Sequence, residues 1–224
     1  MNPRIAPSHP RPHRRRNEIL RTATQLFAER GYEGTSMAEL AERAGVRKAS
    51  LFHHFPGKEA IYVEVLTAHV AVVKDAITRA AALPGSYAER LDAMGDAIVT
   101  VLGAHPCAAR LLTREVMDWG PVVRGGLSKK IMVVLGAVEA FVRDGQEEGA
   151  FVEAEPRQLI LSVIALCFMP FVLGEIAQRF AGAAPTSTLF AAWRREAVRL
   201  HVRRLLLAAP APTARRRRPS ASRA

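Results

Sequence analysis

Residues 35–58 read TSMAELAERAGVRKASLFHHFPGK, a stretch that predicts two short helices joined by a tight turn. Ser36 and Glu39 have the spacing of a capping box, so the first helix should begin at Ser36. Apolar residues then recur at helical spacing as far as Ala44. Gly45 should end this helix, because glycine readily adopts the positive φ that a sharp turn requires.

The second helix of the pair is expected from Arg47 to Phe55. Leu51 and Phe55 share one of its faces, which leaves the basic and polar side chains on the other faces. A small Ala41, the Gly45 turn and a buried Leu51 have the spacing of a helix-turn-helix. These three positions alone would also suit a polar helical hairpin in another kind of bundle.

A longer segment, from about Arg14 to Val65, resembles the N-terminal DNA-binding domain of the TetR/AcrR repressors. The rest of the chain resembles that family only in being helical and of suitable length. The resemblance implies an all-α fold, in which a three-helix helix-turn-helix DNA-binding domain precedes a larger helical ligand-binding and dimerisation domain. It rests on four stretches: ILRTATQLFAERG at 19–31, YEGTS at 32–36, AGV at 44–46 and LFHHFPGKEA at 51–60.

Charge is distributed unevenly along the chain. Residues 1–60 hold 11 Lys and Arg against 6 Asp and Glu, residues 61–209 hold 16 against 15, and residues 210–224 hold 5 arginines and no acid. A positive field confined to the two ends favours a DNA-binding head, although an arginine-rich composition also contributes. The expected divisions are a basic arm, a helix-turn-helix domain, a helical ligand-binding and dimerisation domain, and a basic tail: 1–13, 14–60, 61–209 and 210–224.

The arm and the tail are rich in proline and arginine, so both are expected to be disordered. Arg14–Arg16 and Arg215–Arg218 would then add sequence-independent contacts to phosphates or to a minor groove. A purely solubilising role for the same arginines is the alternative.

The resemblance also implies which residues meet DNA. Arg47–His53 would form the exposed part of the recognition helix, and His54 and Lys58 would contact phosphates. Phe52 departs from the family pattern, in which tyrosine is usual, so a hydroxyl contact is lost while the ring can still pack on a thymine methyl. Lys58 also fits a solvated helix start. The predicted DNA-binding set is Thr35, Ser36, Arg47, Lys48, Ala49, Ser50, Phe52, His53, His54 and Lys58.

Helix-capping residues, prolines and a glycine divide the remainder of the chain into further predicted helices. A long helix should run from Gly57 towards Ala80 and connect the two domains mechanically. Later helix boundaries are marked by capping residues, by prolines suited to a first turn, and by a glycine. These marks are Ser86 with Glu89, Pro106, Pro121, Gly149, Pro156, and Thr186 or Ser187.

The segment from Leu159 to Phe180 is expected to form one apolar helix with a kink at Pro170. Its uninterrupted apolar stretch, 159–174, reaches 16 residues, short of the about 20 needed to cross a membrane. Together with the final helix it should form a homodimer interface, as the resemblance implies; completing a monomer core is the alternative. Such a dimer would place two recognition helices on an inverted-repeat operator in double-stranded DNA.

The helices between Ser86 and Gly149 should enclose a pocket for an apolar or amphipathic small-molecule effector. Methionine and aromatic residues at helical spacing also suit a plain core, and this alternative stays open. Leu112, Met117, Met132 and Met169 are further candidates for the lining, with Arg110 and Asp118 as polar groups. The predicted ligand-binding set is Met94, Ile98, Leu102, His105, Leu111, Glu115, Trp119, Phe141, Phe168 and Phe171.

Motifs for catalysis and for metal binding are missing from the sequence. It contains no P-loop, GxGxxG, GxSxG or HExxH string, so no enzymatic activity, cofactor or metal is expected. His53 and His54 are adjacent and diverge by about 100° on a helix, which prevents joint chelation. Cys107 and Cys167, without a signal peptide, suggest reduced thiols in a cytoplasm.

These features predict a dimeric, sequence-specific transcriptional regulator, in the leading interpretation a repressor that a small-molecule ligand releases from its operator. A DNA-binding regulator that acts without a ligand, or an activator, is the first alternative. A helical-bundle enzyme or carrier is the second. The ligand, the operator sequence and the sign of regulation are left open.

Overall fold

The structure is a computed structural model that describes residues 12–208. This part of the chain consists of α-helices, one π-helical turn and one isolated β-bridge between Phe151 and Leu207. The predicted all-α fold is confirmed. The helices are α1 (Pro12–Arg30), α2 (Met37–Arg43), α3 (Lys48–His54), α4 (Lys58–Ala81), α5 (Tyr87–Ala104), α6 (Pro106–Met117), η1 (Val123–Leu127), α7 (Ser128–Glu147), α8 (Pro156–Val172), α9 (Glu175–Ala181) and α10 (Thr188–Leu206).

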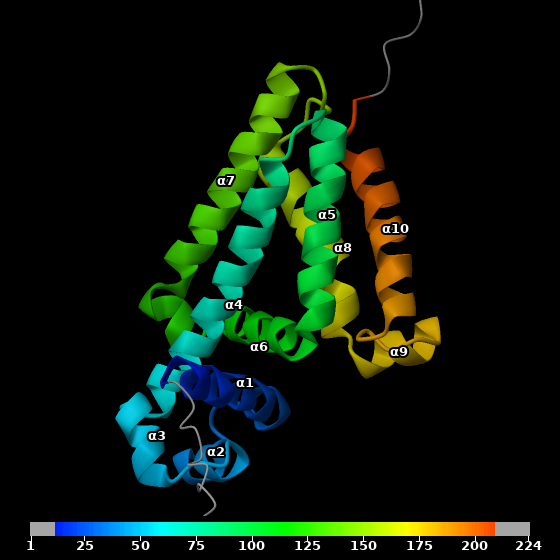
Figure 1. Cartoon of the computed structure of the whole chain (residues 1–224). Coiled ribbons are helices and arrows are strands. Elements are labelled where there is room, and N and C mark those ends of the chain that lie inside the picture. The colour runs from blue at the N-terminus through cyan, green and yellow to red at the C-terminus, as the bar shows by residue number, and fades with distance from the viewer. Residues whose placement is uncertain (1–11, 209–224) are drawn as a thin grey trace, which may run out of the picture.

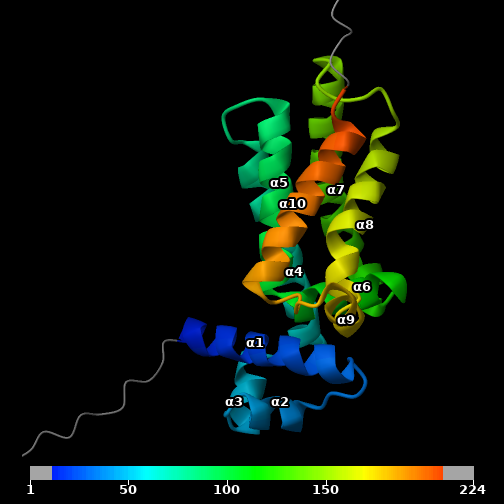
Figure 2. The same ribbon diagram turned by 90° about the vertical axis from the view of Figure 1, so that its right-hand side faces the viewer.

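Helices α1, α2 and α3 form a small head at the lower end of the molecule in both ribbon views (Figures 1 and 2). One apolar side of α1 faces the other two helices, and its Phe27 is fully buried. Leu40 from α2 and Leu51 from α3 are fully buried in the same cluster. Neither α2 nor α3 is long enough to be stable alone. The burial of each large apolar side chain contributes about 2 kcal/mol to the stability of the folded head, and this holds the short helices together.

The turn between α2 and α3 has the geometry that the sequence predicts. Ser36 is the N-cap of α2, and its Oγ accepts a hydrogen bond from the Glu39 backbone N–H at 3.2 Å. Gly45 has a φ of +62°, and the Val46 N–H closes the turn on the Ala41 carbonyl at 2.9 Å. Both the N-cap and the glycine turn are confirmed.

The capping box at this N-cap is only half formed. The Glu39 carboxylate pairs with Arg30 of α1, whereas a full capping box would have it return to the Ser36 backbone N–H. A tertiary ion pair therefore takes the side chain that the local motif would use. At the start of α5 the box is complete: the Ser86 N–H donates to Glu89 Oε2 at 2.8 Å, and the Glu89 N–H donates to Ser86 Oγ at 3.3 Å.

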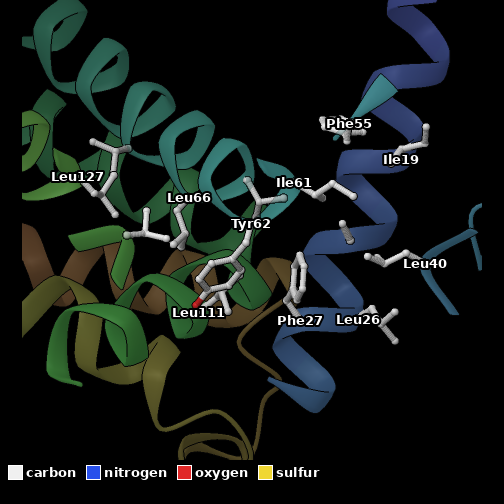
Figure 3. Close-up of a cluster of buried hydrophobic side chains, with 14 of the residues drawn as sticks. Ile19, Leu26, Phe27, Leu40, Phe55, Ile61, Tyr62, Leu66, Leu111 and Leu127 are labelled. Atoms are coloured by element: carbon white, nitrogen blue, oxygen red, sulfur yellow. The ribbon is translucent and has the colours of Figure 1, made fainter. Parts of the chain in front are cut away.

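Helix α4 belongs to both parts of the molecule (Figure 1). Its first turns place Ile61 and Leu66 in the cluster that contains the head core, and its last turns place Ala80 in a second cluster among α5, α7, α8 and α10. Figure 3 shows Tyr62 of α4 reaching towards Phe27 of α1, with Leu111 of α6 close by. The head-side core therefore continues past residue 60, across the predicted division between head and body.

Two expected long helices are each broken in two. The helix predicted from Pro121 is interrupted at η1, where Gly126 has a φ of +127° and turns the chain before α7 begins. The helix predicted from Leu159 to Phe180 ends at Val172, and Gly174, with a φ of +53°, leads into α9 at a bend of 90°. Left-handed backbone of this kind favours glycine, so these glycines mark the real ends.

Pro170 lies inside α8, two residues before the helix ends at Val172. A proline has no N–H for the carbonyl four residues earlier, which here belongs to Leu166. Arg194 of α10 donates from Nη2 to that Leu166 carbonyl at 2.7 Å. The neighbouring helix thus supplies the hydrogen bond that the proline removes.

The N-terminal boundary also differs from the expectation. Helix α1 begins at Pro12, so Arg14–Arg16 are helical and do not belong to a disordered arm. The predictions for residues 1–11 and for the tail, including Arg215–Arg218, lie outside the described residues. Within residues 12–208, no single helix has the length and hydropathy of a membrane span; α8 and α9 reach it only as a pair, across their 90° bend.

Candidate nucleic-acid interface and effector cavity

The exposed face of α3 carries most of the predicted DNA-binding residues. Ser36 is exposed at the start of α2, and the N-cap of α3 and its outer face are exposed from Arg47 onward. The Phe52 ring is 45% exposed although it is aromatic, whereas Leu51 and Phe55 anchor the opposite face. The exposed members of the predicted set are Ser36, Arg47, Lys48, Ala49, Ser50, Phe52 and His53.

The cations of the head fall into two groups. Arg43 forks onto the Glu29 carboxylate at 2.9 and 3.0 Å, and Arg30 pairs with Glu39. Arg47 and Lys48 form no ion pair within residues 12–208. Their charges remain free for an external anion such as a DNA phosphate, or for the O6 and N7 acceptors of guanine.

Arg16 of α1 fixes the recognition helix from behind. It donates to the backbone carbonyl of His54, at the C-terminus of α3, at 3.0 Å, and its guanidinium lies 4.2 Å from the centre of the Phe55 ring. It also pairs with Glu64 on α4. One side chain therefore ties α1, α3 and α4 together, and the backbone of His54 is committed to this contact.

Besides the N-cap Ser36, two predicted DNA-binding residues make internal side-chain hydrogen bonds. Thr35 is buried, and its hydroxyl donates to the Gly31 carbonyl at 2.8 Å, so it is not part of the exposed surface. Lys58 donates from Nζ to the Tyr32 carbonyl at 2.8 Å and lies 4.2 Å from the centre of the Tyr32 ring. The structure thus gives Lys58 a role in joining α4 to the end of α1, in addition to any phosphate contact.

A cavity of about 550 Å³ lies in the body, within the usual size range of ligand sites. Its walls come from α4, α5, α6, α7, α8 and the end of α10. Of the predicted ligand-binding set, Met94, Ile98, Phe141 and Phe168 line it. The further candidates Leu112, Met117, Met132 and Met169 also line it.

Six predicted ligand-binding residues lie elsewhere. Leu102 and Phe171 are buried in the second cluster, and Leu111 is buried in the head-side cluster. His105 caps the start of α6. Trp119 lies in the turn after α6 with a φ of +47° and is 59% exposed. Glu115 is the sixth predicted ligand-binding residue that does not line the cavity. Apolar character at helical spacing identified the interior but did not separate cavity wall from packed core.

Glu115 is a buried structural carboxylate, 5% exposed. It accepts hydrogen bonds from the Tyr62 hydroxyl at 3.0 Å and from the backbone N–H groups of Val122 and Val123 at 2.8 and 3.2 Å. It therefore caps the chain that leads into η1 and α7 while holding α4. Burial, followed by the charge and hydrogen bond of Glu115, raises the pKa of Tyr62, so the phenol stays protonated and donates.

The sequence reasoning missed the contribution of α4 to the cavity. Val70, Val73 and Ile77 line it. These three residues follow the i, i+3, i+7 spacing of one helix face, which is the signal that could have found them. The same helix anchors the head through Tyr62, so the cavity wall and the head share one rigid element.

A histidine pair lies where α4 meets the head and α6. The rings of His69 and His105 are 5.7 Å apart, and His69 Nε2 is 3.5 Å from the Thr24 hydroxyl of α1. Burial, helped by the nearby His105, lowers the pKa of His69 to about 4, so the ring is neutral at neutral pH. Among the described residues, no group of three or more His, Cys, Asp or Glu side chains is placed to hold a metal ion.

The last helices present large apolar side chains to the outside. Helices α8 and α10 pack side by side, and α10 crosses the front of the body in Figure 2. Trp193 is 45% exposed on α10, whereas the opposite, buried face of that helix packs on α5 and α8. The exposed apolar residues of these two helices and of the residue after α8 are Leu161, Met169, Leu173, Leu189, Trp193, Leu200 and Leu205.

Comparison with known proteins shows which family has this architecture. The family described as "Bacterial regulatory proteins, tetR family" matches residues 19–65, and the "Tetracyclin repressor-like, C-terminal domain" matches residues 88–202. The HTH-type transcriptional regulator RutR of Escherichia coli (strain K12) is 25% identical over 158 residues, which cover 67% of this chain and 71% of RutR.

Two further relatives agree with this match. The HTH-type transcriptional repressor NemR of the same Escherichia coli strain is 29% identical over 140 residues, covering 60% of this chain and 70% of NemR. The structure of the ketosteroid transcriptional regulator KstR2 of Mycobacterium tuberculosis superposes with a TM-score of 0.71 at 19% identity, covering 87% of this chain and 96% of KstR2. These relatives are transcriptional regulators and not enzymes. The chain belongs to the TetR family of bacterial transcriptional regulators.

Proposed function

We propose that this protein is a dimeric repressor that binds an inverted-repeat operator and is released from it by a small molecule bound in the body cavity. The observation that carries this proposal is the double role of α4, which lines the cavity through Val70, Val73 and Ile77 and anchors the head through Ile61 and Tyr62. A ligand that favours another position of α4 would move the recognition helix with it.

The operator-reading residues of the proposal are those on the exposed face of α3. Arg47, Lys48 and His53 are exposed, and the two basic residues have no internal ion pair within the described chain. Phe52 supplies an exposed ring that suits a thymine methyl. Arg16 supports this face by holding the carbonyl end of α3.

The dimer in this proposal forms through α8 and α10. Exposed leucine, methionine and tryptophan on two adjacent helices suit a self-complementary, two-fold interface, because such residues are costly to leave in water. A Trp193→Arg substitution should therefore yield monomers in light scattering. Continued dimerisation of this variant would place the interface elsewhere.

Coupling between cavity and head is proposed to pass through Glu115 as well as through α4. Thr113 and Val116 of α6 line the cavity, and Glu115 between them points to Tyr62. Tyr62 packs against Phe27 and Tyr32, with ring centres 5.0 and 4.8 Å apart. A shift of α6 would therefore displace Tyr62 and, through its ring contacts, the helices of the head.

The first experiment is selection of bound duplexes from a random DNA pool at near-physiological salt, which suppresses non-specific binding. We expect an inverted repeat with half-sites separated by about one helical turn or somewhat more. A Lys48→Ala plus His53→Ala variant should lose at least about tenfold in affinity for it. Lys129→Ala, an exposed change on α7, is the control.

A folded dimer that enriches no DNA sequence would contradict the operator-binding proposal. Ligand release is tested separately, because an effector and the operator must weaken each other's binding by the same factor. If a cavity ligand binds equally well to free and operator-bound protein, the regulator acts without ligand release.

A further inference from the structure

Among residues 12–208, no charged side chain lines the body cavity. The lining consists of aliphatic, aromatic and methionine side chains with one glycine, and the polar exceptions are the Thr113 hydroxyl and the Cys167 thiol. Burial raises the pKa of the Cys167 thiol to about 11, so it is uncharged at neutral pH. A charged group of a bound molecule would therefore meet no fixed counter-charge from the wall.

Three charged residues on the helices that form this wall make contacts outside the cavity lining. Glu115 is held by Tyr62 and by two backbone N–H groups. Arg194 donates from Nη2 to the Leu166 carbonyl, and Arg90 stacks on the Tyr87 ring at 4.0 Å, while the buried Nε of each has no hydrogen-bond partner among the described residues. None of these three charged residues lines the cavity. Burying an isolated charge without a partner is strongly unfavourable, which argues against a charged effector.

Thr113 offers the hydrogen-bonding group of the wall. Its hydroxyl makes no hydrogen bond to another group in residues 12–208, in contrast with Thr100, whose Oγ1 donates to the Asp96 carbonyl of its own helix at 2.7 Å. A hydroxyl can both donate and accept, so Thr113 suits an alcohol or a carbonyl of a ligand.

The apolar lining continues to the outer surface. Met117 from α6, Met132 from α7 and Met169 from α8 all line the cavity, and they are 77%, 58% and 45% exposed. Unbranched methionine side chains adapt readily to apolar molecules of different shape. An opening lined by these methionines admits hydrocarbon molecules. The three methionines offer no ionic group that would select a charged molecule.

From these observations we propose that the effector is an uncharged, mostly hydrocarbon molecule with one hydrogen-bonding oxygen that Thr113 binds. This inference rests on the proposed ligand-responsive function and narrows it to a ligand class. It predicts that carboxylates and quaternary amines of the same chain length bind more weakly than the uncharged molecule.

The test uses three competitors with the same twelve-carbon chain: 1-dodecanol below its aqueous solubility limit, and dodecanoate and dodecyltrimethylammonium below their critical micelle concentrations. They compete against diphenylhexatriene, a fluorescent hydrocarbon without polar atoms, bound to the full-length protein. We expect dodecanol to displace the probe at least about tenfold more effectively than either ion, because an ion must leave water without a partner.

Two variants locate the binding site. Thr113→Val keeps the shape of the side chain. It should lower the affinity for dodecanol by about threefold to tenfold and leave the affinity for diphenylhexatriene unchanged. Thr100→Val, whose hydroxyl bonds within its own helix, is the matched control and should change neither. Ala165→Trp fills the cavity from an exposed wall position and should abolish probe binding.

Several results would overturn the inference. Equal or tighter binding of dodecanoate or of the ammonium ion would show that the cavity accepts charge, and loss of dodecanoate binding in Arg194→Met would assign its partner. Failure of diphenylhexatriene to bind, or no effect of Thr113→Val, would also contradict it. If dodecanol binds as expected but leaves operator affinity unchanged, the ligand class stands and the proposed release mechanism fails.

Discussion

The head and the body of this protein have interiors of different kinds. In the head, Leu26, Phe27, Leu40 and Leu51 are fully buried around a closed core. In the body, side chains of the same apolar types surround a cavity of about 550 Å³, and several of them reach the surface. A closed core holds one geometry because any void loses contacts.

The difference suits two different tasks. A recognition helix must be presented in one orientation, so α3 is held by a full core and by Arg16. In the mechanism that we propose, the body changes when a ligand enters, which requires an interior with room to rearrange. Helix α4 joins the two, because its first half lies in the closed core and its second half lines the cavity.

Leucine truncation gives the largest expected effect on this comparison. Leu26→Ala opens a new void in the head and should lower the free energy of unfolding by about 3–4 kcal/mol. Leu135→Ala enlarges an existing cavity, so its cost should be about 1–2 kcal/mol. Chemical denaturation measures both. Equal losses would mean that the body is packed as tightly as the head.

Glu115→Ala tests the connection between the two regions. It leaves the Tyr62 hydroxyl and the Val122 and Val123 N–H groups without their acceptor, which should cost about 2–3 kcal/mol of unfolding free energy. Glu115→Gln keeps an acceptor and should cost less. Glu175→Ala, in an exposed ion pair with Arg179, is the control. A Glu115→Ala protein of unchanged stability would remove Glu115 from the coupling proposal.

His69 makes the junction sensitive to pH. Its folded-state pKa of about 4 lies below the ordinary 6.5, so the unfolded chain binds more protons between these values. Stability should therefore fall as pH drops from about 6.5 towards 4, by about 2 kcal/mol for this partly solvated ring. His69→Leu should flatten that part of the stability curve, and exposed His53→Gln should not. Parallel curves for wild type and His69→Leu would refute the assignment.

The smallest effect concerns Arg194 and Pro170 in the body. Pro170→Ala restores an N–H that can donate to the Leu166 carbonyl, so the hydrogen bond from Arg194 should matter less in that background. A double-mutant cycle with Arg194→Met should show a coupling of about 1 kcal/mol. Independent, additive effects of the two changes would mean that Arg194 does not compensate for the proline.

Local features were predictable where the physical cause is local. The Ser36 and Ser187 N-caps, the Gly45 turn and the Pro106 helix start all follow from backbone groups that neighbours in sequence must satisfy. The prediction of a complete capping box at Ser36 failed because a distant partner intervened. Glu39 pairs with Arg30 and not with the Ser36 backbone, because the tertiary fold offers a charged partner.

The cavity was predictable in place but only partly in its residues. Met94, Ile98, Phe141 and Phe168 line it as expected, whereas Leu102 and Phe171 are packed core. All six residues have the same apolar character and lie on buried helices. Which of them faces a void depends on how far apart neighbouring helices settle, and helical periodicity does not contain that distance.

The sequence by itself determined the helical fold and the exposed face of α3, because helix caps, a glycine turn and apolar spacing act between near neighbours. The helix-turn-helix was identified only together with the wider family resemblance. Only the tertiary structure decided which polar groups form hydrogen bonds and ion pairs inside the protein. It committed Thr35, Arg16 and Glu115 to internal contacts, and it gave Arg47, Lys48 and Thr113 no side-chain partner within residues 12–208. The physical reason is that a side chain's partner is set by the three-dimensional packing of helices, and a polar group already bonded inside the protein is no longer available to DNA or to a ligand.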